Sequence, residues 1–594
     1  MNEPQADVPD NSVDVAVAVL IFFLGSSVYL ISVLFWLAEQ LSSFFVGNGW
    51  PQPTPAGPVS IVESLVSRLE SNPGPPPSES HRDAGPPWLT YVILTVLLLS
   101  LLCVAIWLAR FALNWRRRRE YRLFRLGFAS GQEIRKVLGA QAVLRKGPSV
   151  RPSRKVEKNV EPREVGFYLG RDIRSRQELF ASVEDVFIIL APPRQGKDVH
   201  FCTPFTIDAP GPCMVTSTRA DAFSNTYGSR ARMGEIHVFD PNGLTSWPER
   251  LRWSPVRGCD DPFTAATRAS SFVAGAGFEV AGDGALYRSA AITVLRCYLH
   301  AASLGGRTIA DIIRWSTEPT DPEPIKLLQG NALSSPSAEK WAGELESMTG
   351  ADPKFRSATW ANLVQALSCF SDPAVVDACS PGQDEIFDLK KFVSGKNTLY
   401  VLGKDKKHGS IAPIVTAMLE DIFDETRKIA SRMPGSRLDP PLTIELNEAA
   451  HIAPLPNLPS YMGDSGGFSI ALHVYLQSLS QARARWGEHE AMIMWDNAAV
   501  RIIMGGAGNV DDLEDISRLM GETPTPRPTT AGPRSRRVLS PEEIRTLEFG
   551  TAVVVARSAR PVEVKLTPWW KRPDGKDIAS GKGRTEEMIL SYSK

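Results

Sequence analysis

A loop that could hold a nucleotide's phosphates follows the apolar run Val186–Leu190. Such loops have Gly, four residues, Gly, Lys and then Ser or Thr, so that backbone N–H groups surround the phosphates and Lys reaches the outer two. Gly196 and Lys197 keep two of these positions, but Ala191 and Asp198 occupy the first and last. A plain strand-to-helix turn is the alternative, since a Gly-Lys pair arises easily by chance. The residues predicted to bind the nucleotide are Ala191, Pro192, Pro193, Arg194, Gln195, Gly196, Lys197 and Asp198.

Further polar residues end two later apolar runs. Asn447 and Glu448 follow Leu442–Leu446, where a Walker B element carries Asp for the magnesium shell and then Glu to polarise the attacking water. Gln477 ends another apolar run, and ligands of open α/β sheets bind at the carboxyl ends of strands. We therefore predict catalytic roles for Glu448, Gln477 and Lys197, with a turn-capping role as the alternative for Gln477.

The predicted magnesium site is irregular in both of its halves. Asp198 has no hydroxyl for the metal, and Asn447 has no carboxylate. In one interpretation the acid has moved across the site, so that Mg²⁺ takes a carboxylate from Asp198 and a neutral oxygen from Asn447. In the other, the fold is retained and catalysis is lost. The sequence leaves both interpretations open.

Short apolar runs alternate with helical stretches from Val183 onward, which indicates a parallel sheet covered by helices. The predicted strands are Val186–Leu190, Cys213–Ser217, Ile236–Phe239, Thr398–Leu402, Leu442–Leu446, Ile470–Leu476, Val500–Met504 and Ala552–Val555. Helix-length patterns replace strands between Asp261 and Glu385. The fold class is thus α/β, a P-loop NTPase domain with an inserted all-α domain.

Two apolar segments near the start are long enough to cross a membrane as helices, at about residues 13–38 and 88–109. Buried core helices are the alternative; a signal peptide is disfavoured because the residues before Val13 are acidic. Arginines cluster directly after the second segment, at Arg110, Arg116, Arg117, Arg118, Arg119, Arg122 and Arg125, whereas the loop 39–87 has two. The positive-inside rule therefore predicts a multi-pass protein of the cell membrane whose large C-terminal part is cytoplasmic.

The predicted organisation comprises a membrane domain with two transmembrane helices (1–115), a basic juxtamembrane connector (116–180), a nucleotide-binding domain in two parts (181–260 and 386–570), an all-helical insertion (261–385) and a polar tail (571–594). The tail is expected to be mobile. Seven scattered cysteines without CxxC spacing argue against a zinc site or a disulfide framework. The balance of 66 basic and 66 acidic residues indicates no single class of partner.

The order of these motifs resembles the TraG/TraD-like coupling proteins of type IV secretion and conjugation, especially diverged actinobacterial forms. The resemblance covers most of the chain. It rests on the two N-terminal spans, the loop Ala191–Asp198, Pro210-Gly211-Pro212, the run Met214–Asp221, Phe239-Asp240-Pro241, Trp253-Ser254-Pro255, the run Asn397–Gly403, Asn447-Glu448, the run Gln477–Gln481, and Asp496-Asn497-Ala498 with Arg501.

The resemblance implies a RecA-like, hexameric ATPase that uses ATP and Mg²⁺ at the inner face of the membrane. It implies DNA or a relaxase–DNA complex as substrate and type IV secretion channel subunits as partners. Many members also place a basic residue where it reaches a neighbouring subunit's nucleotide. Here Arg483, Arg485 or Arg501 could serve, and an ordinary solvated or salt-bridged arginine is the alternative for each.

Two further functions compete with this ATP-driven pump. One is a membrane-anchored substrate receptor that retains the P-loop fold with weakened or absent turnover. The other is a septal double-strand DNA translocase of the same superfamily, which usually has more membrane spans. The helical insertion is the expected substrate-recognition surface.

Overall fold

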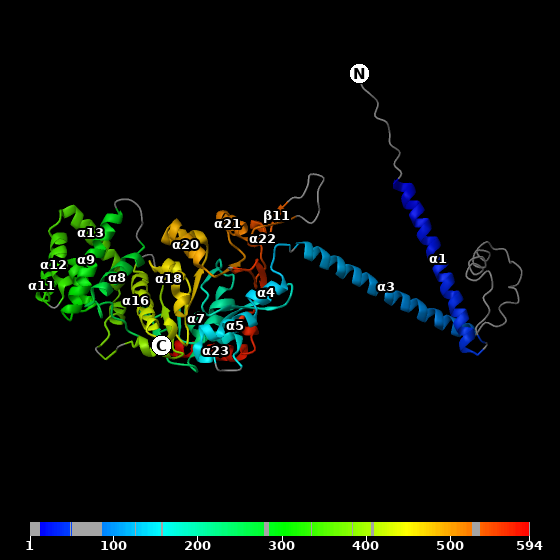
Figure 1. Ribbon diagram of the computed structural model, residues 1–594, viewed down its shortest axis with the longest axis horizontal. Helices are drawn as coiled ribbons and strands as arrows, with labels where there is room; N and C mark the ends of the chain where they lie inside the picture. The colour runs from blue at the N-terminus through cyan, green and yellow to red at the C-terminus, as the bar shows by residue number, and fades with distance from the viewer. Residues whose placement is uncertain are drawn as a thin grey trace, which may run out of the picture. The chain divides into compact units, whose positions relative to one another are not determined.

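The computed structural model describes residues 12–47, 49, 86–124, 126–155, 159–277, 284–333, 335–382, 384–385, 387–404, 409–524, 535–556 and 558–592. For residues 12–25, 28 and 112–124 it describes only the backbone. The chain divides into two compact units, Met1–Phe124 and Arg125–Lys594 (Figure 1).

The first unit contains two long helices, α1 (Ser12–Phe45) and α3 (Pro87–Phe124). They pack together where the rings of Phe35 and Tyr91 meet edge to face at 6.4 Å. Within the described residues, one helical segment, Pro87–Phe111, is long and apolar enough to cross a membrane, and the apolar segment Tyr29–Phe45 of α1 is shorter.

The predicted second span, 88–109, thus coincides with an apolar helix. The predicted first span, 13–38, lies in α1, but many of its side chains are outside the described residues. The side chains of the arginines at 116–119, 122 and 125, and most of the loop 39–87, also lie outside the described residues.

An eleven-stranded sheet forms the centre of the second unit, in the order β2-β1-β13-β12-β9-β3-β8-β7-β4-β6-β5. The seven strands from β9 to β5 are parallel, and the four at the other edge pair antiparallel. The parallel strands are β3 (Phe187–Leu190), β4 (Cys213–Ser217), β5 (Ile236–Phe239), β6 (Thr398–Leu402), β7 (Leu442–Leu446), β8 (Ile470–Leu476) and β9 (Val500–Met504). The antiparallel strands are β1 (Gly166–Asp172), β2 (Glu178–Ser182), β12 (Thr551–Ala556) and β13 (Val562–Lys565).

All eight predicted strands are present, with bounds that agree within one residue. The pattern missed β1, β2 and β13, which form the antiparallel edge. These strands are short or carry charges within them, as in the Val-Glu-Val-Lys of β13, so their apolar runs do not stand out.

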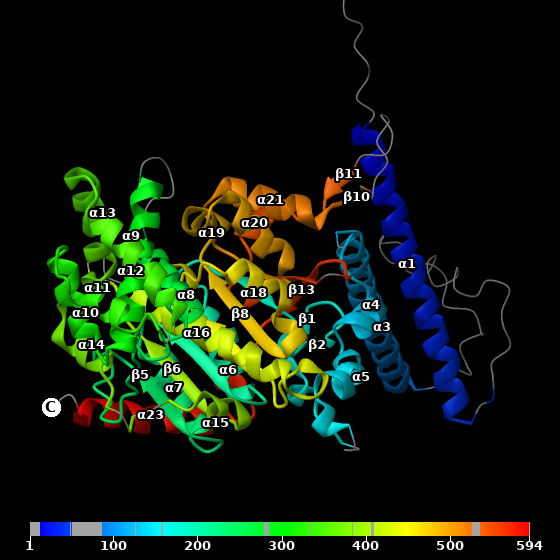
Figure 2. The same cartoon turned by 60° about the vertical axis from the view of Figure 1, so that its left-hand side comes forward.

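Helices cover both faces of the sheet, and alternate residues of each strand contribute to two separate cores. In β3, Ile188 and Leu190 pack into one core, whereas Phe187 and Ile189 pack into the other. The first core includes α16 (Ala412–Ser431) and α18 (Leu458–Asp464) (Figure 2). The second includes α6 (Thr203–Asp208) and α7 (Asp221–Arg230). Burial on both faces explains why these strands are continuous apolar runs.

Seven helices occupy the stretch predicted as an all-helical insertion, and its described residues contain no strand. They are α8 (Pro262–Gly275), α9 (Gly284–Leu304), α10 (Ile309–Thr317), α11 (Glu323–Gly330), α12 (Pro336–Thr349), α13 (Pro353–Ala366) and α14 (Pro373–Ala378). Three of them begin with an Asp-Pro pair, at Asp261, Asp352 and Asp372, and each Asp side chain accepts a backbone N–H of the first turn. The sequence itself therefore marks these helix starts.

Other helices of this unit are α4 (Gly131–Val137), α5 (Ala140–Val150), α15 (Leu389–Ser394), α17 (Ala449–Ile452), α19 (Leu479–Trp486), α20 (Glu488–Asn497), α21 (Val510–Met520) and α22 (Pro541–Arg545). Of these helices, α4 and α5 precede the first strand, and the others lie between strands along the chain. A short hairpin of β10 (Glu522–Pro524) and β11 (Ser535–Arg537) lies beyond α21.

The expectation of a mobile tail was wrong, because Gly575–Tyr592 forms a helix, α23, that packs on α7. A Cβ atom on Gly228 of α7 would lie 3.1 Å from the Cα of Gly581 in α23, so the two backbones approach closely. Ile578 of the same helix is buried in a small separate cluster with Ile207 and Trp569. The pattern missed this helix because its contact surface is made largely by small residues rather than by an apolar stripe.

Candidate functional site

The predicted phosphate loop joins β3 to a helical segment at the carboxyl edge of the sheet. The backbone N–H of Ala191 donates to Leu476 O at 2.9 Å, which continues the β3–β8 ladder by one step. Arg194 and Gly196 have φ angles of 66° and 82°, and the helical segment begins at Asp198. The chain therefore turns sharply at the loop and enters the helix directly after Lys197.

The three residues predicted to be catalytic lie together. Lys197 Nζ donates a hydrogen bond to Glu448 Oε1, and Gln477 Nε2 donates to Glu448 Oε2 at 3.0 Å. They follow β3, β7 and β8, which are neighbours in the sheet. Glu448 has a left-handed backbone conformation (φ 59°), which is strained for a residue with a Cβ. Residues with such strained backbones cluster at functional sites.

The two irregular positions, Asp198 and Asn447, contact each other. Asn447 Nδ2 donates to Asp198 Oδ1 at 2.7 Å, and Thr216 Oγ1 donates to the backbone oxygen of Asn447 at 2.9 Å. Asn447 is 4% exposed, and its Oδ1 is buried with no hydrogen-bond partner in the described structure. The cluster therefore presents an unsatisfied acceptor beside a carboxylate.

The two carboxyl groups of the site have pKa values displaced in opposite directions. Burial raises the pKa of Asp198, Asp221 and Glu448 add to that effect, and Lys197 and Asn447 oppose it. Burial also acts to raise the pKa of Glu448, but the charge and hydrogen bond of Lys197, the hydrogen bond of Gln477 and the charge of His451 together lower it. The folded protein therefore favours the ionised form of Glu448, whereas burial disfavours the ionised form of Asp198.

Oxygen ligands for magnesium are available at this cluster. The Asp198 carboxylate and the unsatisfied Asn447 Oδ1 are both hard oxygen donors, which Mg²⁺ prefers. Among the described residues, no group of three or more His, Cys, Asp or Glu side chains could form a metal cage. Magnesium at phosphates is usually held by one or two protein groups together with phosphate oxygens and water.

The sequence did not indicate two further side chains that extend the polar cluster. Gln481 Oε1 accepts from the backbone N–H of Gln477 at 3.0 Å, and Gln481 Nε2 lies 2.6 Å from His451 Nε2. His451 Nε2 is 4.0 Å from Glu448 Oε2. His451 comes three residues after Glu448, and Gln481 comes four residues after Gln477. Residues at these spacings lie on the same side of a helical turn, and this spacing is the signal that could have revealed them.

The three arginines suggested to reach a neighbouring subunit are engaged within this chain. Arg483 binds Asp512 and Asp515, each at 2.8 Å. The other two bind backbone carbonyls: Arg485 donates to Gly275 O at 3.1 Å, and Arg501 donates to Trp495 O at 2.6 Å. Their positions in the structure therefore agree with ordinary structural arginines.

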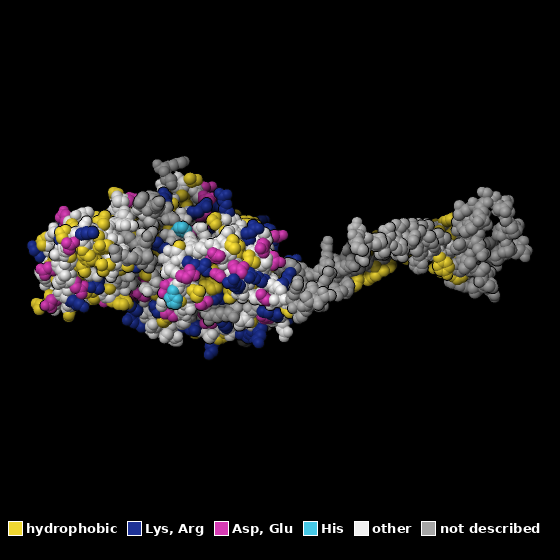
Figure 3. Space-filling model, turned by 90° about the horizontal axis from the view of Figure 1, so that it is seen from above, with side chains coloured by type: hydrophobic (Ala, Val, Ile, Leu, Met, Phe, Trp, Pro, Cys, Tyr) yellow, Lys and Arg dark blue, Asp and Glu magenta, His cyan; other side chains and the backbone are white. Residues whose placement is uncertain are grey.

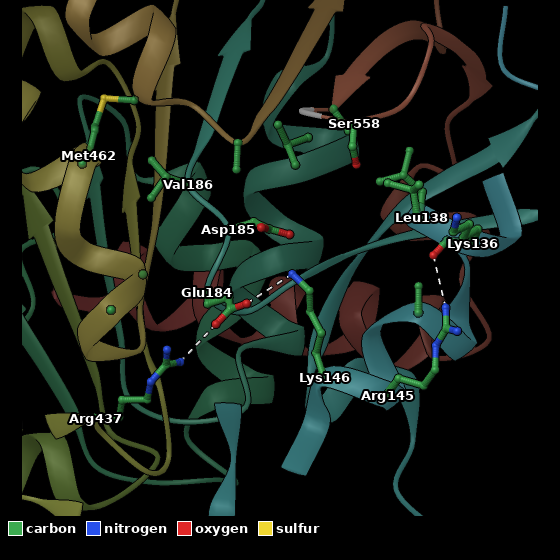
Figure 4. A pocket seen from close by; sticks show the side chains of 18 residues that line it. Lys136, Leu138, Arg145, Lys146, Glu184, Asp185, Val186, Arg437, Met462 and Ser558 are labelled. Carbon is green, nitrogen blue, oxygen red and sulfur yellow. Dashed lines mark hydrogen bonds and ion pairs between the residues drawn. The ribbon is translucent and has the colours of Figure 1, made fainter. Parts of the chain in front are cut away.

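A cavity of about 650 Å³ lies far from this cluster, at the edge of the sheet where β3 and β9 begin (Figure 4). Lys146 and Arg437 both bind Glu184 in its wall, at 3.2 and 3.0 Å. Open α/β sheets bind ligands at the carboxyl ends of their strands, so this cavity lies at the edge opposite to the predicted nucleotide site.

Comparisons with known proteins bear on both the sequence and the fold. Residues 441–549, which include Asn447, Glu448 and Gln477, match a family model described as the TraM recognition site of TraD and TraG. The resemblance to TraG/TraD-like coupling proteins is confirmed. None of the curated proteins compared with the sequence matches it.

Solved structures of the plasmid coupling protein TrwB share this TraG/TraD-like fold. TrwB in complex with the ATP analogue ADPNP is 18% identical, with a TM-score of 0.50, over 65% of this chain and 86% of that chain. The trigonal form of TrwB with sulphate is 16% identical, also with a TM-score of 0.50, over 73% and 93%. At these identities the matches establish a common fold, a large mixed sheet with many helices, and nothing finer.

Proposed function

We propose that this chain is a membrane-anchored coupling ATPase that recruits a DNA or nucleoprotein substrate and drives it into a type IV secretion channel by hydrolysing ATP. The observation that carries the proposal is the meeting of Lys197, Glu448 and Gln477 at the carboxyl edge of three neighbouring strands. The fold shared with TrwB, which binds an ATP analogue, supports a RecA-like P-loop site here.

The contacts suggest how these side chains work. Lys197 now neutralises Glu448. Bound outer phosphates compete for the same ammonium group and leave Glu448 hydrogen-bonded to Gln477, with His451 4.0 Å away. The carboxylate is then free to accept a proton from an attacking water, and Gln477 keeps it oriented. Asp198 and Asn447 would hold magnesium, which supplies charge neutralisation at the phosphate oxygens.

Membrane attachment, assembly and partners complete the proposal. The apolar segment Pro87–Phe111 supports an anchor, and we retain the two-span, multi-pass topology with a cytoplasmic second unit. We propose a homo-hexamer that accepts a relaxase–DNA complex and contacts channel subunits; the match to a TraM recognition site supports recruitment of such partners. The division into connector, two-part nucleotide-binding domain and substrate-binding insertion remains part of the proposal.

On the visible face of the second unit, Lys and Arg side chains are interspersed with Asp and Glu (Figure 3). A strong single-sign field is the usual footprint of a surface that binds nucleic acid by charge alone. On this face, therefore, substrate recruitment through a protein bound to DNA fits better than direct contact with bare DNA.

The second candidate function is a substrate receptor without turnover. Its support is that Lys197 and Glu448 satisfy each other, while the raised pKa of Asp198 reflects a carboxylate buried beside other acids. A site that has lost its nucleotide chemistry while keeping the fold would have these properties.

ATP hydrolysis by the full-length protein in detergent, measured as phosphate release with Mg²⁺ and with or without DNA, tests the proposal. We expect turnover in the wild type and its loss in Lys197→Ala and Glu448→Gln, with ATP binding retained in Glu448→Gln. Lys146→Ala is the matched control, because Lys146 also binds a glutamate but far from the loop. Absence of turnover in the wild type, with or without ATP binding, would contradict the ATPase and favour the receptor.

A further inference from the structure

The positions of the catalytic side chains orient a nucleotide across the loop. Glu448 and Gln477, which act at the outer phosphate, follow β7 and β8 on one side of β3. Because the phosphates form a chain from the outer one to the nucleoside, the nucleoside must lie on the opposite side of β3. The neighbours there are β9 and β12, so the segments at the ends of these strands face the nucleoside.

Two of those segments are fixed against the phosphate loop. The segment after β9 touches the loop directly: a Cβ on Gly506 would lie 2.5 Å from Gln195 Nε2. The segment before β12 is tied to it, because the backbone N–H of Gly506 donates to Arg545 O at 2.9 Å. A ligand that occupies the loop therefore lies beside residues 545–550.

A tight turn in the second segment presents Phe549. The backbone N–H of Thr551 donates to Glu548 O at 3.0 Å, and Thr551 Oγ1 donates to the same oxygen at 2.6 Å. Gly550 has a φ of 78°, the left-handed value needed at the third position of a type II turn. Phe549 occupies the second position, and its side chain points out of the turn instead of into the core.

The ring of Phe549 lies against the loop that binds the phosphates. A Cβ on Gly196 would be 3.1 Å from ring carbons Cε2 and Cζ of Phe549, so only glycine fits there without displacing the ring. His200, in the first turn after the loop, meets the ring edge to face at 5.5 Å. Phe549 is nevertheless 58% exposed, so much of its side chain is available to a ligand.

We propose that the base of the bound nucleotide stacks on Phe549, which makes this side chain a positioning residue for the nucleotide. The inference rests on the proposed function, since it requires the loop to bind nucleotide. An aromatic ring fixed by a turn loses little conformational freedom when a base covers it, and stacking accepts any base because every base has a π face. The site therefore discriminates little between adenine and guanine nucleotides.

Isothermal titration of the full-length protein with ATP and with inorganic tripolyphosphate, both with Mg²⁺, tests the proposal. Tripolyphosphate carries the phosphates without the base. We expect Phe549→Ala to bind ATP and GTP about 5- to 100-fold more weakly and tripolyphosphate as well as the wild type does. Phe549→Trp should retain ATP affinity. Phe263→Ala is the matched control, because Phe263 is a phenylalanine on α8 with a similar exposed fraction, 64%.

Equal losses for ATP and tripolyphosphate in Phe549→Ala would overturn the proposal, since the ring would then only support the loop. Unchanged ATP binding in Phe549→Ala, combined with its loss in Lys197→Ala, would also overturn it and leave the proposed function standing. A wild type that binds neither ligand would overturn both.

Discussion

Replacement of Asn447 by Asp tests whether the two irregular positions form one magnesium site. The Asn447 amide now donates to Asp198 Oδ1 at 2.7 Å in a buried location. Asn447→Asp removes a hydrogen bond to a charged group, worth about 1.5–3 kcal/mol, and brings two carboxylates together, so that one must take up a proton. Without magnesium, we expect the free energy of unfolding at pH 7.5 to fall by about 2–4 kcal/mol.

Magnesium should reverse this loss, because a divalent cation between the two carboxylates replaces the missing donor. Thermal unfolding of the full-length protein with and without MgCl₂ measures the effect. For a unit the size of Arg125–Lys594, about 1 kcal/mol shifts the midpoint by about 1 °C, so the variant should unfold about 2–4 °C lower and recover with magnesium. Recovery should be smaller at pH 6, where the shared proton is held more firmly.

The matched control is Asn457→Asp. Asn457 Nδ2 also donates to a buried carboxylate, Glu420 Oε2, at 2.9 Å, and the pKa of Glu420 is likewise raised by burial. This variant should lose similar stability and gain none of it back with magnesium. Equal recovery in the two variants, or in neither, would refute the reasoning that Asp198 and Asn447 hold the metal.

Three further predictions follow from individual contacts. The pKa of Asp198 is raised on folding, so its contribution to stability is lost as pH rises through the folded pKa. Asp198→Asn should therefore raise the free energy of unfolding at pH 7.5, measured by chemical denaturation. The same variant should weaken Mg²⁺-dependent ATP binding. Burial lowers the pKa of His200 to about 4, so the free energy of unfolding should fall by up to about 3 kcal/mol as pH drops from 6.5 towards 4. His200→Gln should flatten this part of the dependence of unfolding free energy on pH. An unchanged dependence would contradict the role of His200. Gly228→Val should detach α23 and expose the C-terminal segment to limited proteolysis, whereas Gly583→Val, whose Cβ meets nothing within 4 Å, should not.

The parallel part of the sheet was predictable because burial on both faces requires a continuous apolar run in every strand. Leu442–Leu446 and Ile470–Leu476, for example, are buried at every position, and the sequence marks both ends of each run with polar or turn residues. The helix starts at Asp261, Asp352 and Asp372 were equally local, because capping depends on neighbouring residues.

The strands of the antiparallel edge could not be predicted from continuous apolar runs. Strand β1 pairs with β13, almost 400 residues later, and the charged residues of β13 conceal its apolar face. The packing of α23 on α7 through Gly581 and Gly228 is also a long-range contact between small residues. Such contacts leave no periodic pattern in either segment.

At the site, the sequence by itself determined which chemical groups are present. The phosphate loop ends with Lys197 and the carboxylate of Asp198. The carboxylate of Glu448, next to the amide of Asn447, follows one buried strand, and the amide of Gln477 follows another. These identities follow from local position relative to apolar runs.

Only the tertiary structure decided which of these groups meet. In the order β12-β9-β3-β8-β7, Glu448 contacts both Lys197 and Gln477, Asn447 contacts Asp198, and Phe549 lies against Gly196. The physical reason is that strand order and pairing arise from burial shared by the whole sheet, which no single segment encodes.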